Sequence, residues 1–402
     1  MAKLMYQIST SKRSKRTLSI PESHTLYLCP NSCARRHGLR ALRNGILDDV
    51  SFLRFSQTDI VTGAYEERIY ETCDRLLALL PHRPRVVSLQ VNCIDDFLGT
   101  DARALVEELS RQHPDVRFTL SRINPIAGDV SKAKLQGIHS RLYEPLEASE
   151  KRDDGITLLG HFEAIPSDCE FHRVVGQLGL GPIRQLFACE DYAAYERLAQ
   201  SRLAVSLSHI GDAALLDFEE RLNVPGMRWH ACYDIGEIAR RYGELASLAG
   251  GEVDVSSHID EARDAVDRAR KALEGFSVAI DSSATMRPFS LALDLLAYGF
   301  DVRLVFALHA KADDSASARR LAEEHPEVTI VRRGGAEAVI GGDWPVDSDA
   351  CVAVGSDAAF LLNSSRAVDI YHDEGLFGFQ GVIALMDELR AAASRSRSRN
   401  RS

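Results

Sequence analysis

The chain has 402 residues, of which 45% are hydrophobic and 26% are charged, and its formal net charge is −10. This composition is typical of a soluble protein with two or three domains. No run approaches the ~18–20 apolar residues of a membrane span, residues 1–16 lack the apolar segment of a secretory signal, and the cysteines are too sparse for a disulfide scaffold. We therefore expect a cytoplasmic protein that does not bind a membrane.

Positive charge is concentrated at the two ends of the chain. Residues 1–16 carry five basic residues and no acid, and the Ser/Arg tail carries four arginines from Arg395 onward. Without these nine positive charges the net charge of the rest would be −19 rather than −10. An acidic body disfavours nucleic acid as the main partner. We predict a basic N-terminal arm and a disordered tail at 393–402.

Apolar and amphipathic segments alternate through the first third of the chain. They predict strands at about 25–29, 50–55, 85–93 and 116–121, and helices at about 33–44, 64–80, 101–113 and 131–147. Strands rich in Val, Ile and Leu between such helices are typical of a parallel sheet covered on both faces. Cys73 lies on the apolar stripe of its helix, so we predict a core residue. A charged linker at 150–155 gives a first domain at 17–148.

Two further α/β units follow the linker. The second, at 149–275, is predicted to have strands near 156–160, 183–188 and 227–231, helices near 167–178, 191–200 and 211–222, and a polar connector helix at about 256–274. The third, at 276–392, is predicted to have strands near 276–280, 302–307, 328–331 and 350–354 and a final helix near 380–392. The chain is thus predicted to be an α/β protein with parallel sheets.

Two cysteines each follow a predicted strand of the first unit. Residues 26–37 form a strand, a turn at Pro30, and a helix whose N-terminus lies near Cys33. The strand at 85–93 likewise delivers Cys93 at its carboxyl end. Parallel sheets bind ligands at that edge, and a helix N-terminus favours a thiolate. The two thiols could therefore line one crevice, which we take as the candidate ligand-binding site.

Two other interpretations of these thiols remain open. The spacing alone favours buried structural cysteines, as free cysteines often are. A zinc site is a second alternative, because His24, Cys29, Cys33 and His37 lie within fourteen positions, although their spacing fits no common zinc module.

An ordered set of motifs resembles the nitrogenase component 1 family. The set consists of Cys33, the segment 55–66 (Phe-Ser-Gln-Thr-Asp-Ile-Val-Thr-Gly-Ala-Tyr-Glu), Cys93, and the terminal Gly-Leu-Phe-Gly turn within 373–382. The resemblance covers roughly residues 20–392 and implies three Rossmann-like domains around a shared cleft. The family includes molybdenum–iron protein subunits, their scaffold relatives, and the reductases of chlorophyll and coenzyme F430 synthesis.

The resemblance implies a subunit of a two-component reductase. An ATP-dependent iron protein would deliver low-potential electrons to a cluster on Cys33 and Cys93, which would relay them to a small-molecule or cofactor substrate. No cysteine precedes Cys29, which argues against an eight-iron cluster. A [4Fe–4S] cluster is expected instead, completed by a homologous chain in a homodimer or heterodimer. Cys29 is a candidate third thiolate, and Asp95 a candidate oxygen ligand.

The resemblance also bears on the reaction. The strand at 203–208 carries no cysteine to hold a catalytic cofactor, so dinitrogen reduction is not expected. The cleft would lie between Cys93, the segment after Phe162, the turn after Ile280, and residues 371–373. His372 is the candidate proton donor, since a histidine can supply protons near neutral pH. The alternatives are a non-enzymatic scaffold or maturation factor for a metallocofactor, and a Rossmann-type binding protein without metal.

Overall fold

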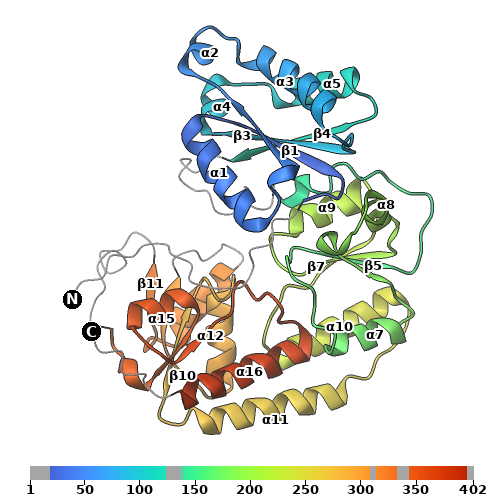
Figure 1. The fold of residues 1–402 in the computed structure, drawn as a ribbon. Helices are drawn as coiled ribbons and strands as arrows, with labels where there is room; N and C mark the ends of the chain where they lie inside the picture. The colour runs from blue at the N-terminus through green and yellow to red at the C-terminus, as the bar shows by residue number, and fades with distance from the viewer. Residues whose placement is uncertain (1–18, 124–136, 138, 308–313, 333–343, 396–402) are drawn as a thin grey trace. The chain divides into compact units, whose positions relative to one another are not determined.

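The computed structural model describes residues 19–123, 137, 139–307, 314–332 and 344–395 (Figure 1). These divide into two compact units, one containing residues 19–160 and 182–228 and the other residues 161–181 and 229–395. The expected basic arm and most of the expected tail lie outside the described residues, as do residues 131–136 and 138 of the helix expected at 131–147. In the described part of that segment the helix ends at residue 141, and a turn follows at 142–145. No described helix is both long and apolar enough to cross a membrane.

The first unit contains two parallel sheets, and the first of them has the strand order β2-β1-β3-β4. Its strands are β1 (Ser23–Cys29), β2 (Val50–Arg54), β3 (Val86–Asn92) and β4 (Arg117–Ile123), and its helices are α1 (Asn31–Asn44), α2 (Gln57–Val61), α3 (Tyr65–Leu79), α4 (Cys93–Leu98) and α5 (Ala102–Gln112). All four strands and the helices expected before residue 113 are confirmed.

The two faces of this sheet are covered differently. Alternate strand residues such as Leu26 and Leu28 pack with the buried face of α3 and α5, and Cys73 is fully buried in that cluster, as predicted. On the opposite face, Tyr27 stacks on His37 of α1 and on Phe52 of β2. The helix α1 buries only Ala34 and Ala41, so most of its surface is left uncovered.

The second sheet has the same order, β6-β5-β7-β8. Its elements are β5 (Ile156–Leu159), β6 (Ile183–Arg184), β7 (Leu203–Ser206), β8 (Gly226–Arg228), α8 (Tyr192–Glu196) and α9 (Asp212–Glu220). The strand expected at 183–188 ends after Arg184, because the apolar run that follows forms a short 3₁₀ helix that buries Leu186. Gly160 ends β5 at φ +90°, and its carbonyl accepts the Ser208 hydroxyl at 2.7 Å.

The second unit is built on a five-stranded parallel sheet, β11-β10-β9-β12-β13. Its strands are β9 (Ser277–Asp281), β10 (Asp301–Ala307), β11 (Thr329–Arg332), β12 (Cys351–Val354) and β13 (Ala367–Val368), and its helices are α7 (Glu170–Gln177), α10 (Ile235–Ala249), α11 (Ser256–Ala272), α12 (Pro288–Ala297), α13 (Ser315–Glu324), α15 (Ser356–Leu362) and α16 (Gly378–Ser394). The expected strands of the third α/β segment are confirmed.

Two helices of this unit differ from what the sequence predicted. The helix interpreted as a connector is α11, which runs beside α16 (Figure 1) and buries a stripe of small residues formed by Ala262, Ala265, Val266 and Ala269. The preceding helix α10 was not expected. Three parallel sheets with covering helices confirm the predicted fold class.

The strand orders locate the ligand-binding edge of each sheet. In a doubly wound sheet, ligands bind at the carboxyl ends of the two strands where the chain reverses its winding direction, the topological switch point. These strand pairs are β1 and β3, β5 and β7, and β9 and β12. The predicted cysteines follow the first pair.

Candidate functional site

Cys33 and Cys93 flank the switch point of the first sheet. The strands β1 and β3 pair directly, with Leu28 opposite Val91, and each is followed at once by a helix. Cys33 lies in the first turn of α1, and Cys93 is the first residue of α4. The Asn92 side chain joins the two strand ends, because it donates to the Leu28 carbonyl at 3.1 Å and accepts the Ile94 N–H at 2.8 Å.

The two helix starts differ in how they are capped. Asn92 caps α4, whereas α1 begins after Pro30 with no side-chain cap and no acidic residue in its first turn. Cys33 and Cys93 are free thiols and are only half-buried. A partly exposed thiol at an uncapped helix N-terminus is suited to bind as a thiolate.

Cys29 occupies a different environment. It is 1% exposed at the end of β1, and burial, with a smaller effect of nearby Cys33, raises its pKa to about 12. Its thiol is therefore held protonated at neutral pH. The ligand role of Cys29 stays a prediction, one that requires the thiol to become exposed and ionised.

Asp95 is also turned into the protein. It is 1% exposed, its Oδ1 accepts the Tyr65 hydroxyl at 3.2 Å, and its Oδ2 lies 3.3 Å from the Arg122 guanidinium. Burial, with Asp95 beside it, raises the pKa of Tyr65 above its usual range. The role of Asp95 as an oxygen ligand stays a prediction that would break this arrangement.

The residues of the alternative zinc site do not come together in the structure. The His24 ring is hydrogen-bonded to the Ser51 hydroxyl at 2.9 Å, and the His37 ring stacks on Tyr27. Within the described ranges, no three His, Cys, Asp or Glu side chains are grouped so that they could hold a metal ion. Each chain therefore offers two accessible thiols at this edge, and no complete ligand set within the described part.

A second polar group surrounds the switch point of the third sheet. The Asp281 carboxylate at the end of β9 is buried and accepts the backbone N–H groups of Ser283, Ala284 and Ala358. Burial raises its pKa. Gly355 follows β12 at φ +107°, and a β-carbon there would clash with this carboxylate. Asp281 thus ties the ends of β9 and β12 together.

The loop around His372 is fixed onto this switch point. The backbone N–H groups of His372 and Asp373 donate to the carbonyls of Ser283 and Ala284, both at 2.9 Å. Both loop residues have left-handed backbone conformations, with φ of 49° and 62°. Such strain persists only where surrounding contacts hold it, and it is concentrated at functional sites.

Two consecutive buried carboxylates hold this loop in place. Asp373 accepts the hydroxyls of Tyr233 and Thr285 at 2.9 Å, and burial raises its pKa to about 6. Glu374 accepts the backbone N–H groups of Phe162 and Glu163, and burial raises its pKa to about 8. Three of the four segments predicted to line the cleft therefore lie together in this unit, with half-buried His372 among them.

Glu170 explains the terminal Gly-Leu-Phe-Gly motif and was missed by the sequence analysis. Its buried carboxylate accepts the Phe379 N–H at 2.6 Å, the Gln380 N–H at 3.1 Å and the Tyr242 hydroxyl at 2.7 Å. Gly378 approaches it so closely, at φ +61°, that a side chain would clash. The glycine in the motif indicates that the backbone there approaches another group closely. No local sequence pattern indicates that this group is Glu170.

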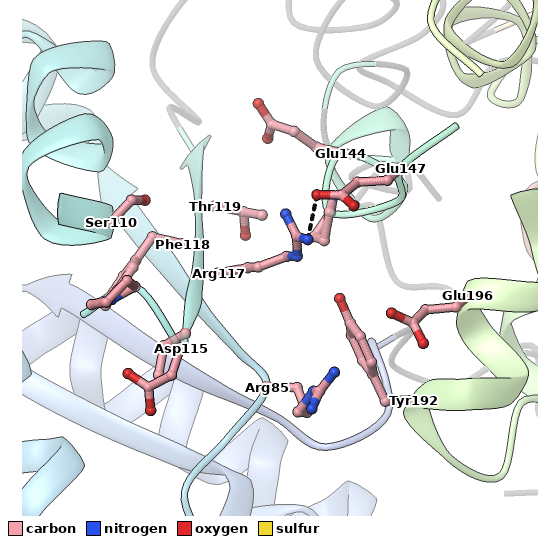
Figure 2. Close-up of a pocket in the computed structure, with 13 residues that line it drawn as sticks. Arg85, Ser110, Asp115, Arg117, Phe118, Thr119, Glu144, Glu147, Tyr192 and Glu196 are labelled. Atoms are coloured by element: carbon pink, nitrogen blue, oxygen red, sulfur yellow. Dashed lines mark hydrogen bonds and ion pairs between the residues drawn. The ribbon is translucent and has the colours of Figure 1, made fainter. Parts of the chain in front are cut away.

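A cavity of about 660 Å³ lies at the other edge of the first sheet. Figure 2 shows Arg85 before β3 and Arg117 in β4 near Tyr192 of α8. Arg85 stacks over the Tyr192 ring at 4.8 Å, and Arg117 pairs with Glu147. Because this cavity is at the amino ends of the strands, it is separate from the edge that carries the cysteines.

These features define an α/β protein of three parallel sheets with paired thiols at the first switch point. The chain belongs to the nitrogenase component 1 type oxidoreductase family, whose model matches residues 16–394. The structure is similar to the solved structure described as "Nitrogenase Cp1 at pH 6.5", with a TM-score of 0.66 and 15% identity over 94% of this chain and 89% of that one.

A second solved structure shares the fold. The one described as "Nitrogenase Cp1 at pH 5" has a TM-score of 0.60 and 14% identity over 93% of this chain and 85% of the other. A comparison with curated proteins finds no match. The predicted family resemblance is confirmed.

Proposed function

We propose that the chain is a nitrogenase-like reductase subunit that holds an iron–sulfur cluster through Cys33 and Cys93. The observation that carries this proposal is the position of two half-buried free thiols on adjacent helix starts at the β1/β3 switch point. The cluster would relay low-potential electrons from an ATP-dependent iron protein to a small-molecule or cofactor substrate.

The residues at this edge fit a cluster. Thiolates are its usual ligands, and backbone N–H groups and helix dipoles near the sulfurs stabilise its negative charge. The uncapped start of α1 places such donors beside Cys33. When bound, the cluster would supply one-electron transfer. The thiols would hold it, and Asn92 would fix the spacing of the two strand ends that carry them.

Ligand number supports a two-chain site. A [4Fe–4S] cluster takes four ligands, and each chain presents two accessible thiols at the β1/β3 switch point. A second, homologous chain that brings the same pair would complete the set. We therefore propose a homodimer or heterodimer with the cluster at or near the subunit interface. Cys29 and Asp95 would serve as further ligands only if their buried arrangements opened.

The substrate would bind near the β9/β12 switch point. The polar turn at 281–283 and the loop at 371–374 meet there, and both are held by buried carboxylates. His372 lies in this loop, and we propose it as the proton donor, since a histidine can supply protons near neutral pH. Its half-buried position supports that role.

Iron and acid-labile sulfide in anaerobically purified protein test the proposal. We expect both in the wild type, and their loss in Cys33→Ala and Cys93→Ala. The matched control is Cys73→Ala, which should keep the iron and lose about 1–2 kcal/mol of stability because it leaves a small cavity in the core. Full iron in both ligand variants would contradict the assignment. Reductant consumption with an iron protein and ATP then distinguishes a reductase from a scaffold.

A further inference from the structure

One face of α1 carries four arginines that have no acidic partner. Arg35, Arg36, Arg40 and Arg43 are all exposed, and none forms an ion pair or side-chain hydrogen bond with any residue that the structure describes. The helix itself contains no Asp or Glu. Its arginines at positions i and i+4 repel one another, which destabilises a helix.

Most arginines on the other described helices have an acidic partner. On α10, Arg240 and Arg241 pair with Glu237 and Glu244 one turn away. On α5 and α13, Arg103 pairs with Glu107 and Arg320 with Glu324. The unpaired set on α1 is therefore a local departure in a chain whose body is acidic.

The same face exposes apolar surface. Leu39 is 48% exposed and Leu42 is 61% exposed. Arg35, Arg36, Leu42 and Arg43 each lie three or four positions from Leu39, so these five residues are neighbours on the helix surface. Arg40 lies farther round the helix, on the side of Cys33, and all six residues lie outside the stripe of buried Ala34 and Ala41. We call these six residues the α1 face. An apolar patch bordered by arginines has the composition of a protein interface.

The α1 face borders the proposed cluster site. Arg36 and Arg40 follow Cys33 by three and seven residues, so they lie along the same side of the helix as the thiol. Burial, followed by the charges of Arg36 and Arg40, lowers the pKa of His37. His37 is thus held neutral, and the arginines supply the charge of this face.

We propose that the α1 face docks an acidic electron-donor protein next to Cys33. This inference rests on the proposed function and specifies the chemistry of its partner: carboxylates around a small apolar patch. A second copy is a poor occupant, because a two-fold contact through this face would set four arginines against four arginines. Nucleic acid would meet the arginines but leave the leucines unused.

Salt-dependent binding to defined acidic proteins tests the inference. The full chain is titrated calorimetrically with a purified nitrogenase iron protein and with an acidic [2Fe–2S] ferredoxin. We expect at least one of them to bind at about 50 mM NaCl and to bind about tenfold or more weakly at about 300 mM, where charges are screened.

Matched variants locate the surface. Arg36→Glu/Arg40→Glu should weaken binding by about tenfold or more, and Arg36→Gln/Arg40→Gln by less. Leu39→Ser/Leu42→Ser should weaken it with little change in its salt dependence. The control Arg75→Glu/Arg103→Glu changes the net charge equally on α3 and α5, away from this face, and should alter binding less than twofold.

Four results would overturn the inference: no binding of either protein at low salt, equal binding by the test and control variants, loss of a dimer in Arg36→Glu/Arg40→Glu, or equally tight binding of a short DNA duplex. Iron content is measured on the same samples. If the wild-type protein contains no iron, the proposed function is wrong. If a variant keeps its iron but no longer binds the donor protein, only the role of the α1 face is affected.

Discussion

Gly378 shows two independent constraints on one residue. Its φ of +61° is strained for any side chain, and its α-carbon approaches the Glu170 carboxylate and the Tyr242 hydroxyl too closely to allow a β-carbon. This arrangement lets Glu170 accept the first N–H groups of α16. A glycine in the terminal motif is therefore required by geometry in this structure.

We predict that Gly378→Ala destabilises the protein by about 2 kcal/mol or more, since it adds both strain and a clash beside a buried carboxylate. Urea unfolding measures the change. The control is Gly243→Ala in the interior of α10, where the added β-carbon meets nothing within 4 Å. That substitution should stabilise by about 0.4–1 kcal/mol. Equal effects at the two positions would contradict this account.

His372 is the residue through which we test the reaction. Its ring stacks on Tyr371 at 4.0 Å, and its backbone is fixed against Ser283. If it supplies protons, His372→Ala should slow reductant consumption by about 100-fold. Iron content and electron uptake from the iron protein should stay the same. Unchanged turnover would remove His372 from the mechanism without affecting the cluster ligands.

At the level of elements, the stability that the loop 371–374 contributes should depend on pH, because Glu374 can ionise. Burial raises the pKa of this residue from 4.5 to about 8, so the folded chain holds its proton more tightly than the unfolded chain does. The stability that this group contributes is fully present below about pH 4.5 and is lost as the pH rises through about 8.

Thermal unfolding of Glu374→Gln between about pH 6 and about pH 9 checks this effect. The glutamine oxygen can still accept the Phe162 and Glu163 N–H groups, and the variant cannot ionise. The wild type should therefore lose more stability than the variant over that interval. The control is Glu196→Gln on α8, which should keep the wild-type slope; parallel curves for wild type and Glu374→Gln would contradict the prediction.

Most elements with strong local signals could be predicted, whereas the packing that depends on distant contacts could not. The strands before Cys33 and Cys93 were clear because apolar runs end in turn residues. The helix α10 has a comparable signal, with Asp234 capping its start and Ile235, Ile238 and Tyr242 buried at helical spacing, but it was overlooked. The burial of α11 depends on its packing along α16, which no local pattern reveals.

The same distinction holds for the candidate site. Parallel strands placed Cys33 and Cys93 at one edge, because topology alone brings the carboxyl ends of such strands together. Cys29 and Asp95 were singled out by proximity in sequence, yet their burial is set by packing that the sequence does not display. Glu170 contacts Phe379 across more than two hundred residues, which only the fold can show.

The whole molecule combines the family's fold with a ligand set that one chain leaves incomplete within its described residues. The described part of the chain provides two accessible thiols at the β1/β3 switch point, and a cluster with four thiolates therefore needs a second chain. The unpaired arginines of α1 lie beside this point, and we propose that they provide a separate surface for an electron donor. The central claim is that two chains share one cluster.

Native mass spectrometry of the anaerobic protein tests that claim most directly. The account predicts a species with the mass of two chains plus one [4Fe–4S] cluster, and metal-free chains for Cys33→Ala and Cys93→Ala. A heterodimeric partner would appear as one copy of this chain with a homologous chain and the same cluster. A single chain that carries a complete cluster, or a wild-type dimer that carries none, would contradict the account.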